Sequence, residues 1–159
     1  AYGGSCTGGK KADMEMYAEV VRKAMDKGLS LKAKTYIQFG SQRIRDYAEK
    51  MGYVQLFEGA GIELIDPSCG ACIKAGPGVS FTADEVTVSA INRNFPGRSG
   101  PGDVYLASPY VVVASAFLGH VGGPDERSTV RDRRALRELC SCDASLTLLQ
   151  TRILVPALA

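Results

Sequence analysis

VTVSAINRNFPGRSGPGDVYLASPYVVVASAFLGH, residues 86–120, is the stretch that decides the fold class of this chain. VTVSA and VYLAS are short runs rich in β-branched residues, which is typical of strands, and a loop rich in glycine and arginine separates them. Ser108 and Pro109 then precede an apolar run, and this pair favours the start of a helix. The stretch therefore predicts a strand, a loop, a second strand and an apolar helix, in that order.

Upstream of this stretch, helical and strand-like patterns alternate. Apolar residues recur at helical spacing within residues 11–27, and Gly28 follows as a stop signal. The β-rich run AKTYIQF precedes a helix that we expect Ser41 to cap and that ends near Met51. A shorter helix through Gly59 leads to the strand-like run IELI, whereas we expect the opening AYGGSCTGG to be a loop.

Strands separated by helices predict an α/β fold, with layered βαβ units around a mainly parallel sheet. In such sheets, ligands bind beyond the carboxyl ends of the strands. GGSCTGG opens a helix, PSCGACIKAGPG follows IELI, and NRNFPGRSGPG follows VTVSA. We therefore expect these three loops to reach one edge of the sheet.

Composition narrows the class of protein. The 159 residues are enough for about one domain with a real core, so the cysteines are not needed for bulk stability. The 19 Lys and Arg nearly balance the 17 Asp and Glu, which predicts no surface-wide field for nucleic acid or anionic membrane. The longest apolar run, near residues 110–119, is half of the ~20 residues that a bilayer crossing needs. Without a visible signal peptide, we expect a cytoplasmic protein whose first residues look like the middle of a longer chain.

Residues 121–159 have a different character and predict a divergent basic tail, partly helical or disordered. Within it, RSTVRDRRALR is typical of a solvated charged face, because no aromatic residues interleave with its arginines to stack on bases. Cys140 and Cys142 are too tightly spaced for the usual structural zinc pattern.

Cys69 and Cys72 form a C-x-x-C pair inside the Pro- and Gly-rich run IDPSCGACIKAGPG. Four explanations fit such a pair: half of a zinc site, a redox dithiol, part of an iron–sulfur site, or ordinary buried cysteines. Structural zinc wants four Cys or His ligands in two close pairs, and His120 is the only histidine. With Cys6 as a third thiolate, a [4Fe-4S] cluster would keep one iron without a protein ligand. The residues alone leave these alternatives open.

Three motifs together resemble a known family. They are GSCT at Gly4–Thr7, PSCGACIKAGPG at Pro67–Gly78, and the long stretch from Ser89 to His120. Their order and spacing are similar to the cluster-binding domain of the aconitase superfamily, which includes aconitase, homoaconitase and the 3-isopropylmalate dehydratase large subunit. The likeness is greatest to the last two, and it predicts an aconitase-like domain over residues 1–120 that is part of a larger enzyme.

The resemblance implies a hydro-lyase that dehydrates and rehydrates a hydroxy di- or tricarboxylic acid. It implies that Cys6, Cys69 and Cys72 ligate a [4Fe-4S] cluster whose fourth iron binds the hydroxyl and a carboxylate of the substrate. It also places Asn92 beside the cluster and implies that Arg93 and Arg98 hold substrate carboxylates. Arginine suits that role because its planar, permanently charged fork binds carboxylates through two hydrogen bonds.

The chain also departs from the family. Gly8 and Gly9 stand where many relatives carry Asn-Ser after the first SCT. In the family, the serine base belongs to a swivelling domain or small subunit, and further assisting residues lie upstream. We therefore expect no full reaction from this chain alone.

Two other classes of function remain beside the hydro-lyase module. A cluster-bearing sensor or RNA-binding protein could use the basic tail, although the near-neutral charge weighs against it. A thiol redox protein could use the C-x-x-C pair, but Cys6 and the arginine loop would then have no role.

Overall fold

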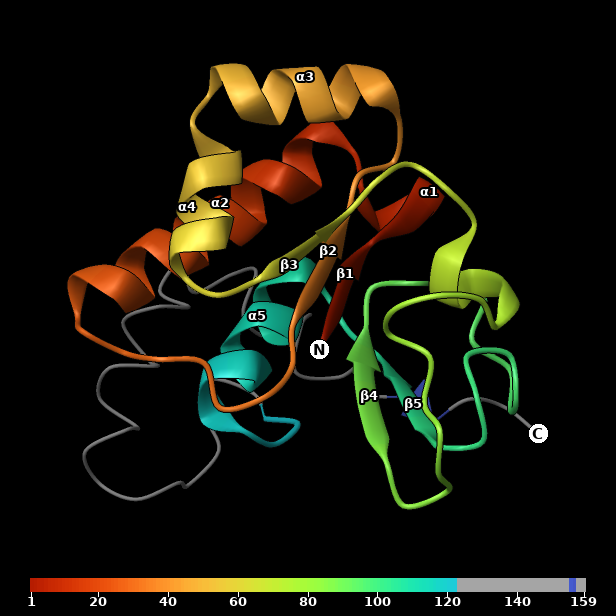
Figure 1. Ribbon diagram of the computed structural model, residues 1–159. Coiled ribbons are helices and arrows are strands. Elements are labelled where there is room, and N and C mark those ends of the chain that lie inside the picture. The colour runs from red at the N-terminus through yellow and green to blue at the C-terminus, as the bar shows by residue number, and fades with distance from the viewer. Residues whose placement is uncertain (123–154, 157–159) are drawn as a thin grey trace.

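The computed structural model of the chain describes residues 1–122 and 155–156. In this part of the chain, six strands form one sheet in the order β3-β2-β1-β4-β5-β6 (Figure 1). The strands are β1 Tyr2–Gly4, β2 Tyr36–Gln38, β3 Glu63–Ile65, β4 Val86–Ser89, β5 Asp103–Leu106 and β6 Val155–Pro156. Strands β1 to β5 pair in parallel and β6 joins β5 antiparallel, which confirms the α/β class with a mainly parallel sheet.

Four of the described helices match segments expected from the sequence: α2 Lys11–Asp26, α3 Gln42–Lys50, α4 Tyr53–Gly59 and α5 Pro109–Leu118. The short helix α1 Ser5–Gly8 and the 3-10 turn η1 Gly70–Ile73 lie in stretches that were expected to be loops. At the start of α5, the Ser108 hydroxyl accepts a hydrogen bond from the backbone N–H of Val111, as predicted. The predicted cap of α3 is only half right, because Ser41 occupies the N-cap position without a side-chain hydrogen bond.

The opening residues are a strand and a short helical turn, so the expectation of a loop was wrong. β1 is central in the sheet, with β2 on one side and β4 on the other. Two of its three residues are glycine, so it lacks the alternating apolar pattern that marks a strand in a sequence. Its backbone pairing therefore depends on partners that are distant in the chain.

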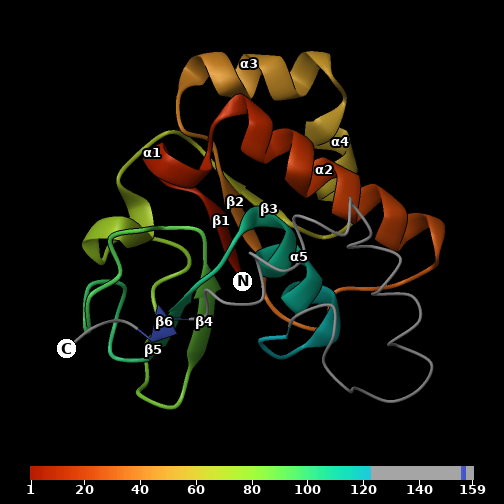
Figure 2. The same cartoon turned by 180° about the vertical axis from the view of Figure 1, so that it is seen from behind.

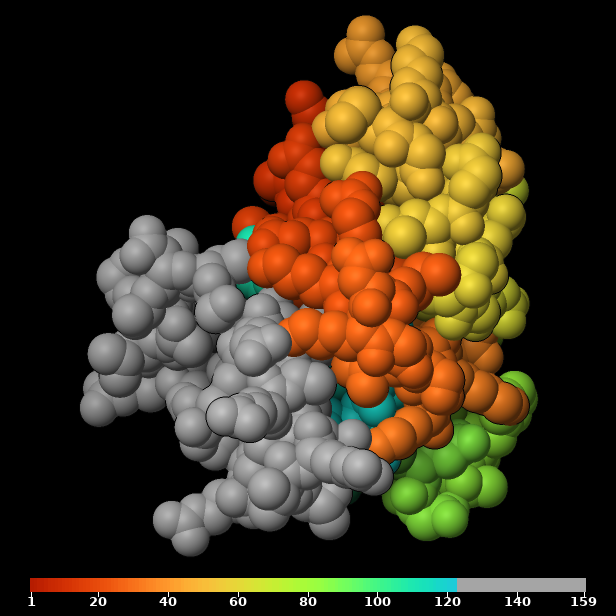
Figure 3. Space-filling model, turned by 90° about the vertical axis from the view of Figure 1, so that its left-hand side faces the viewer, coloured from red at the N-terminus to blue at the C-terminus, as the bar shows by residue number. Residues whose placement is uncertain are grey.

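One face of the sheet carries the helices and the main core. Figure 2 shows α2 and α5 in front of the strands, and Figure 3 shows α2, α3 and α4 forming a continuous outer surface. Tyr17 and Val21 of α2, Phe57 of α4, and Val113 and Phe117 of α5 are buried in this core. Ile37 and Phe39 of the β2 region face the same side. The helices therefore pack against the strands through one apolar core, which supports the strand ends.

The segment between β3 and β4 packs on the opposite face. There Tyr2, Ala71, Cys72 and Ile91 form a separate small cluster. A Cβ on Gly78, whose φ is +86°, would overlap the ring of Tyr2, so the loop lies directly on that ring. The C-x-x-C segment is thus packed against the sheet.

Most of the basic tail lies outside the described residues, including Cys140, Cys142 and the arginine-rich run 127–137. The described pair 155–156 forms β6 beside β5. Within the described part of the chain, no helix is both long enough and apolar enough to cross a bilayer. The apolar α5 has ten residues and is buried in the core.

Tyr17 connects the helix layer to the loop that carries Cys6. Its ring is fully buried, and a Cβ on Gly3 would lie 2.8 Å from the ring carbon that bears the hydroxyl. The hydroxyl accepts a hydrogen bond from the Gly4 N–H at 3.0 Å and donates one to the Gly8 carbonyl at 2.9 Å. One hydroxyl thereby closes the turn that follows β1.

We predict that Tyr17→Phe lowers the free energy of unfolding by about 1–3 kcal/mol, because two buried backbone groups lose their partner. Urea denaturation followed by circular dichroism measures the change. Tyr47→Phe is the control, because the Tyr47 hydroxyl bonds Glu15 at the exposed surface and should matter much less. Equal losses in the two variants would contradict the role assigned to Tyr17.

Candidate functional site

The loops that follow β1, β3 and β4 meet at the carboxyl edge of the sheet. A Cβ on Gly8 would lie 2.9 Å from the Cβ of Ala90, so the loops after β1 and β4 are in contact. The Ser99 hydroxyl donates to the carbonyl of Ala71 at 2.9 Å, which joins the loops after β4 and β3. The sequence predicted this meeting at one edge, and it is confirmed.

Cys6 lies in the tight turn after β1. Gly4 has φ +101° and Ser5 has φ +68°, a left-handed conformation that is uncommon for a residue other than glycine. Such strained backbone often accompanies functional sites. The Cys6 side chain is exposed, and its sulfur lies 3.8 Å from the Ser5 hydroxyl. The thiol is therefore presented to solvent on a constrained turn.

The structure explains why positions 8 and 9 are glycine. A Cβ on Gly9 would lie 2.7 Å from the carbonyl oxygen of Gln38 and equally close to the backbone N of Gly40. Gly8 is pressed against Ala90, and its carbonyl accepts from Tyr17. Neither position has room for a side chain.

Cys69 and Cys72 lie at the two ends of one helical turn. The backbone N–H of Cys72 donates to the carbonyl of Cys69 at 3.0 Å. Cys69 is exposed, whereas Cys72 is only 8% exposed. Gly70 and Lys74 both have positive φ angles, +48° and +63°, which let the chain turn tightly around the thiols. The pair therefore presents one thiol outward and one inward.

Arg98 contacts the inner thiol. Its Nη2 donates to the Cys72 sulfur at 3.4 Å, and its guanidinium lies 5.2 Å from the centre of the Phe95 ring. Its Nε is buried without a hydrogen-bond partner among the described residues. Asn92 and Arg93, on the same loop, are exposed. Of the residues expected to hold a substrate, Arg98 is the one that the fold places directly against a cysteine.

The three thiols do not gather into a finished metal site. Within residues 1–122 and 155–156, no group of three or more His, Cys, Asp or Glu side chains is arranged to hold a metal ion. The donor chemistry nevertheless fits an iron–sulfur group, because thiolates are its usual ligands. In addition, the buried side-chain atoms without a partner in this part of the chain are Thr7 Oγ1 and Arg98 Nε, each beside a cysteine. These residues therefore fit such a group in chemistry, with the thiols on adjoining loops.

Sequence reasoning missed two residues at this edge, Tyr2 and Gln38. The Tyr2 hydroxyl donates to Gln38 Oε1 at 2.9 Å, and both side chains are buried. Burial raises the pKa of Tyr2 to about 12, against a smaller lowering by a backbone hydrogen bond. A glutamine inside the strand-like run YIQF was the available signal, since a buried amide requires partners.

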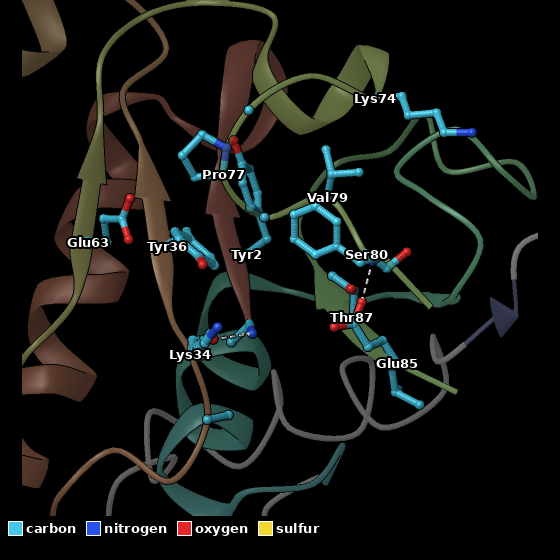
Figure 4. Close-up of a pocket in the computed structure, with 16 residues that line it drawn as sticks. Tyr2, Lys34, Tyr36, Glu63, Lys74, Pro77, Val79, Ser80, Glu85 and Thr87 are labelled. Atoms are coloured by element: carbon cyan, nitrogen blue, oxygen red, sulfur yellow. Dashed lines mark hydrogen bonds between the residues drawn. The ribbon is translucent and has the colours of Figure 1, made fainter. Parts of the chain in front are cut away.

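A hollow of about 690 Å³ opens on the sheet face opposite the helices. Figure 4 shows Tyr2, Tyr36 and Pro77 on one side of it and Val79 and Thr87 on the other. Among the described residues, neither a cysteine nor Arg98 lines it. The hollow therefore borders the loop that follows the thiol turn, but none of the three candidate thiols lines it.

Residues 1–119 match the sequence profile of the aconitase family (aconitate hydratase). The chain belongs to the aconitase family. It is 38% identical over 125 residues to the 3-isopropylmalate dehydratase large subunit of Clostridioides difficile, covering 77% of this chain and 28% of that protein. It is also 38% identical over 128 residues to the mitochondrial homoaconitase of Candida albicans, covering 79% of this chain and 18% of that protein.

The match to the aconitase family confirms the resemblance drawn from the cysteine and arginine motifs. A third relative, the mitochondrial homoaconitase of Candida glabrata, is 38% identical over 152 residues, which cover 90% of this chain and 22% of that protein. The chain thus spans less than a third of each of these relatives. Within the family, the described residues correspond to a part of a longer enzyme.

We predict that the chain loses stability between pH 10 and pH 12, because the Tyr2 pKa rises from 10 in the unfolded chain to about 12 in the fold. Stability from the buried neutral hydroxyl is full below pH 10 and disappears as the pH passes 12. Urea titrations at several alkaline pH values test this, with reductant present. Tyr2→Phe should make the decline shallower without abolishing it, because burial also raises the pKa of Tyr17. An unchanged slope would contradict the prediction.

Proposed function

We propose that residues 1–120 are the cluster-binding module of a hydro-lyase that removes and re-adds water on a hydroxy di- or tricarboxylic acid. Family membership supports this reaction class. The observation that carries the proposal is the contact between the Arg98 guanidinium and the Cys72 sulfur. This contact lies at the edge of the sheet where the loops with the three candidate thiols meet. A carboxylate-binding group and the cysteine loops then share one site.

Cys6, Cys69 and Cys72 would hold a [4Fe-4S] cluster. Such a cluster, when bound through three thiolates, supplies an iron with an open position that acts as a Lewis acid toward a substrate oxygen. The glycines beside the thiols favour this assignment, because they let backbone N–H groups approach sulfur closely. The exposed thiols of Cys6 and Cys69 are accessible to iron and sulfide from solvent.

The arginines would bind and orient the substrate. Arg93 is exposed and can meet a carboxylate from solvent, whereas the half-buried Arg98 is held between Cys72 and Phe95. Two carboxylate anchors on one loop would fix which carbon of the substrate faces the thiol turn. Asn92 lies on the same exposed loop, where we place it beside the cluster.

Other parts of the enzyme would complete the reaction. Removal of the proton α to a carboxylate requires a base, and we assign it to a serine on a swivelling domain or small subunit outside this chain. The name of the Clostridioides difficile relative, a large subunit, fits a partner of this kind. The chain alone would bind cluster and substrate without turnover.

We predict that the anaerobically reconstituted chain binds about four irons, because three thiolates suffice to hold the cluster. Cys6→Ser, Cys69→Ser and Cys72→Ser should each remove most of the iron. Iron and sulfide analysis, with visible and electron paramagnetic resonance spectra, measures the result.

Cys140→Ser and Cys142→Ser are the matched controls and should keep the full iron content. Binding of zinc instead of iron by the reconstituted chain would contradict the hydro-lyase assignment. Dithiol redox activity that needs only Cys69 and Cys72 would contradict it as well. Retention of RNA at physiological salt would favour a binding protein instead.

We predict that Arg98→Gln weakens binding of 3-isopropylmalate or citrate to the loaded chain by about ten-fold or more, because a charged, paired hydrogen-bond donor is lost. Arg93→Gln should act in the same direction. Calorimetry measures the affinity, and Arg43→Gln, on the exposed side of α3, is the control. Unchanged affinity in both loop variants would refute their assignment as carboxylate anchors.

A further inference from the structure

Gln38 is a fully buried polar residue at the carboxyl end of β2. Its amide Nε2 donates to the Ser68 carbonyl at 2.9 Å and to the Ser68 hydroxyl at 2.8 Å, with the Asp66 carbonyl at 3.3 Å. Its Oε1 accepts from the Tyr2 hydroxyl at 2.9 Å. The side chain therefore binds the segment immediately before Cys69.

The backbone of the same residue touches the other cysteine loop. Gln38 pairs with Gly4 in the parallel ladder between β1 and β2. A Cβ on Gly4 would overlap the Gln38 carbonyl, and a Cβ on Gly9 would lie 2.7 Å from the same oxygen. Gly4 and Gly9 flank the short helix that contains Cys6. One residue thus contacts the Cys6 loop through its backbone and the Cys69 loop through its amide.

The chemistry of its partners fixes the orientation of the amide. The Ser68 carbonyl can only accept a hydrogen bond, so the amide nitrogen must face it. The amide oxygen then faces Tyr2, whose hydroxyl donates to it. Gly70 lies against this pair, because a Cβ there would be 3.1 Å from both Gln38 Nε2 and the Tyr2 hydroxyl. The Cys69–Cys72 turn therefore packs against the Gln38 amide and the Tyr2 hydroxyl, whose orientations are fixed by their hydrogen bond.

We propose that Gln38 is a positioning residue that sets the placement of the Cys69–Cys72 turn relative to the Cys6 loop. Tyr2 holds the Gln38 amide in its orientation through a hydrogen bond. Loss of the amide leaves the Ser68 carbonyl and the Tyr2 hydroxyl without their partners, which favours states in which the turn lifts away from the sheet. This inference rests on the proposed function only where it treats the three cysteines as ligands of one cluster.

The test uses the 159-residue chain with Gln38→Met, which keeps the length of the side chain and removes its hydrogen bonds. The reduced, metal-free chain is treated with iodoacetamide, and peptide mass spectrometry follows Cys72 and Cys6 separately. We expect iodoacetamide to alkylate Cys72 about ten-fold faster in the variant than in the wild type. The reason is that the buried thiol becomes exposed when the turn moves away from the sheet. Cys6 should react within about two-fold of its wild-type rate, since its loop keeps its Tyr17 contacts.

Thr35→Val is the matched control. Thr35 is also buried near β2, but its hydroxyl donates to Ala33, away from the cysteine edge. The control should leave Cys72 reactivity within about two-fold of wild type, because global stability rather than the thiol turn is affected.

An equal rise in both variants, or no rise in folded Gln38→Met, overturns the inference. If Gln38→Met does not fold, Tyr2→Phe and Ser68→Ala replace it, and unchanged Cys72 rates in both overturn it.

Iron release separates this inference from the proposed function. In loaded chain treated with a chelator, Gln38→Met should lose iron about ten-fold faster than wild type, because the ligand turn opens more often. A wild-type chain that takes up no iron, while Gln38→Met still exposes Cys72, refutes the cluster and leaves the positioning role standing. A loaded variant that keeps wild-type iron release and wild-type Cys72 reactivity refutes the positioning role and leaves the cluster standing.

Discussion

The close approach of backbone at the carboxyl ends of β1 and β2 is the constraint on which the candidate site depends. Gly9 and Gly40 are joined there by a backbone hydrogen bond of 2.9 Å, and neither could carry a side chain without overlap. This contact seats the Cys6 turn directly on β2. Because Gln38 lies at the same point, its side chain can extend from that contact to the turn that carries Cys69.

The two faces of the sheet are covered differently. The helices cover one face with a continuous apolar core, and Tyr17 extends that core into the Cys6 turn through two hydrogen bonds. The other face carries the loop with the thiol pair, which is held by a few polar contacts and a small cluster around Tyr2. The helix layer thus supports loops on which the thiols of Cys6 and Cys69 are exposed and that of Cys72 is buried.

Local charge at this edge differs from the charge of the whole chain. The net charge of +2 predicted no field across the surface, yet the loop after β4 places Arg98 against Cys72 and leaves Arg93 exposed nearby. Its contacts with the Cys72 sulfur and the Phe95 ring hold the Arg98 guanidinium in one orientation. A nearly balanced composition thus coexists with two arginines on one loop at this edge.

Sequence patterns were enough to predict helices α2 to α5, the parallel strands β2 to β5, and the order of the cysteine and arginine motifs. Those features depend on local periodicity, on cap residues such as Ser108, and on motif spacing within short segments. Two features became visible only in the folded chain: the glycine-rich opening is a central strand, and Gln38 and Tyr2 connect the cysteine loops. The physical reason is that both depend on contacts between residues about thirty or more positions apart, such as Gln38 with Ser68 and Tyr2 with Gln38, which no local pattern encodes.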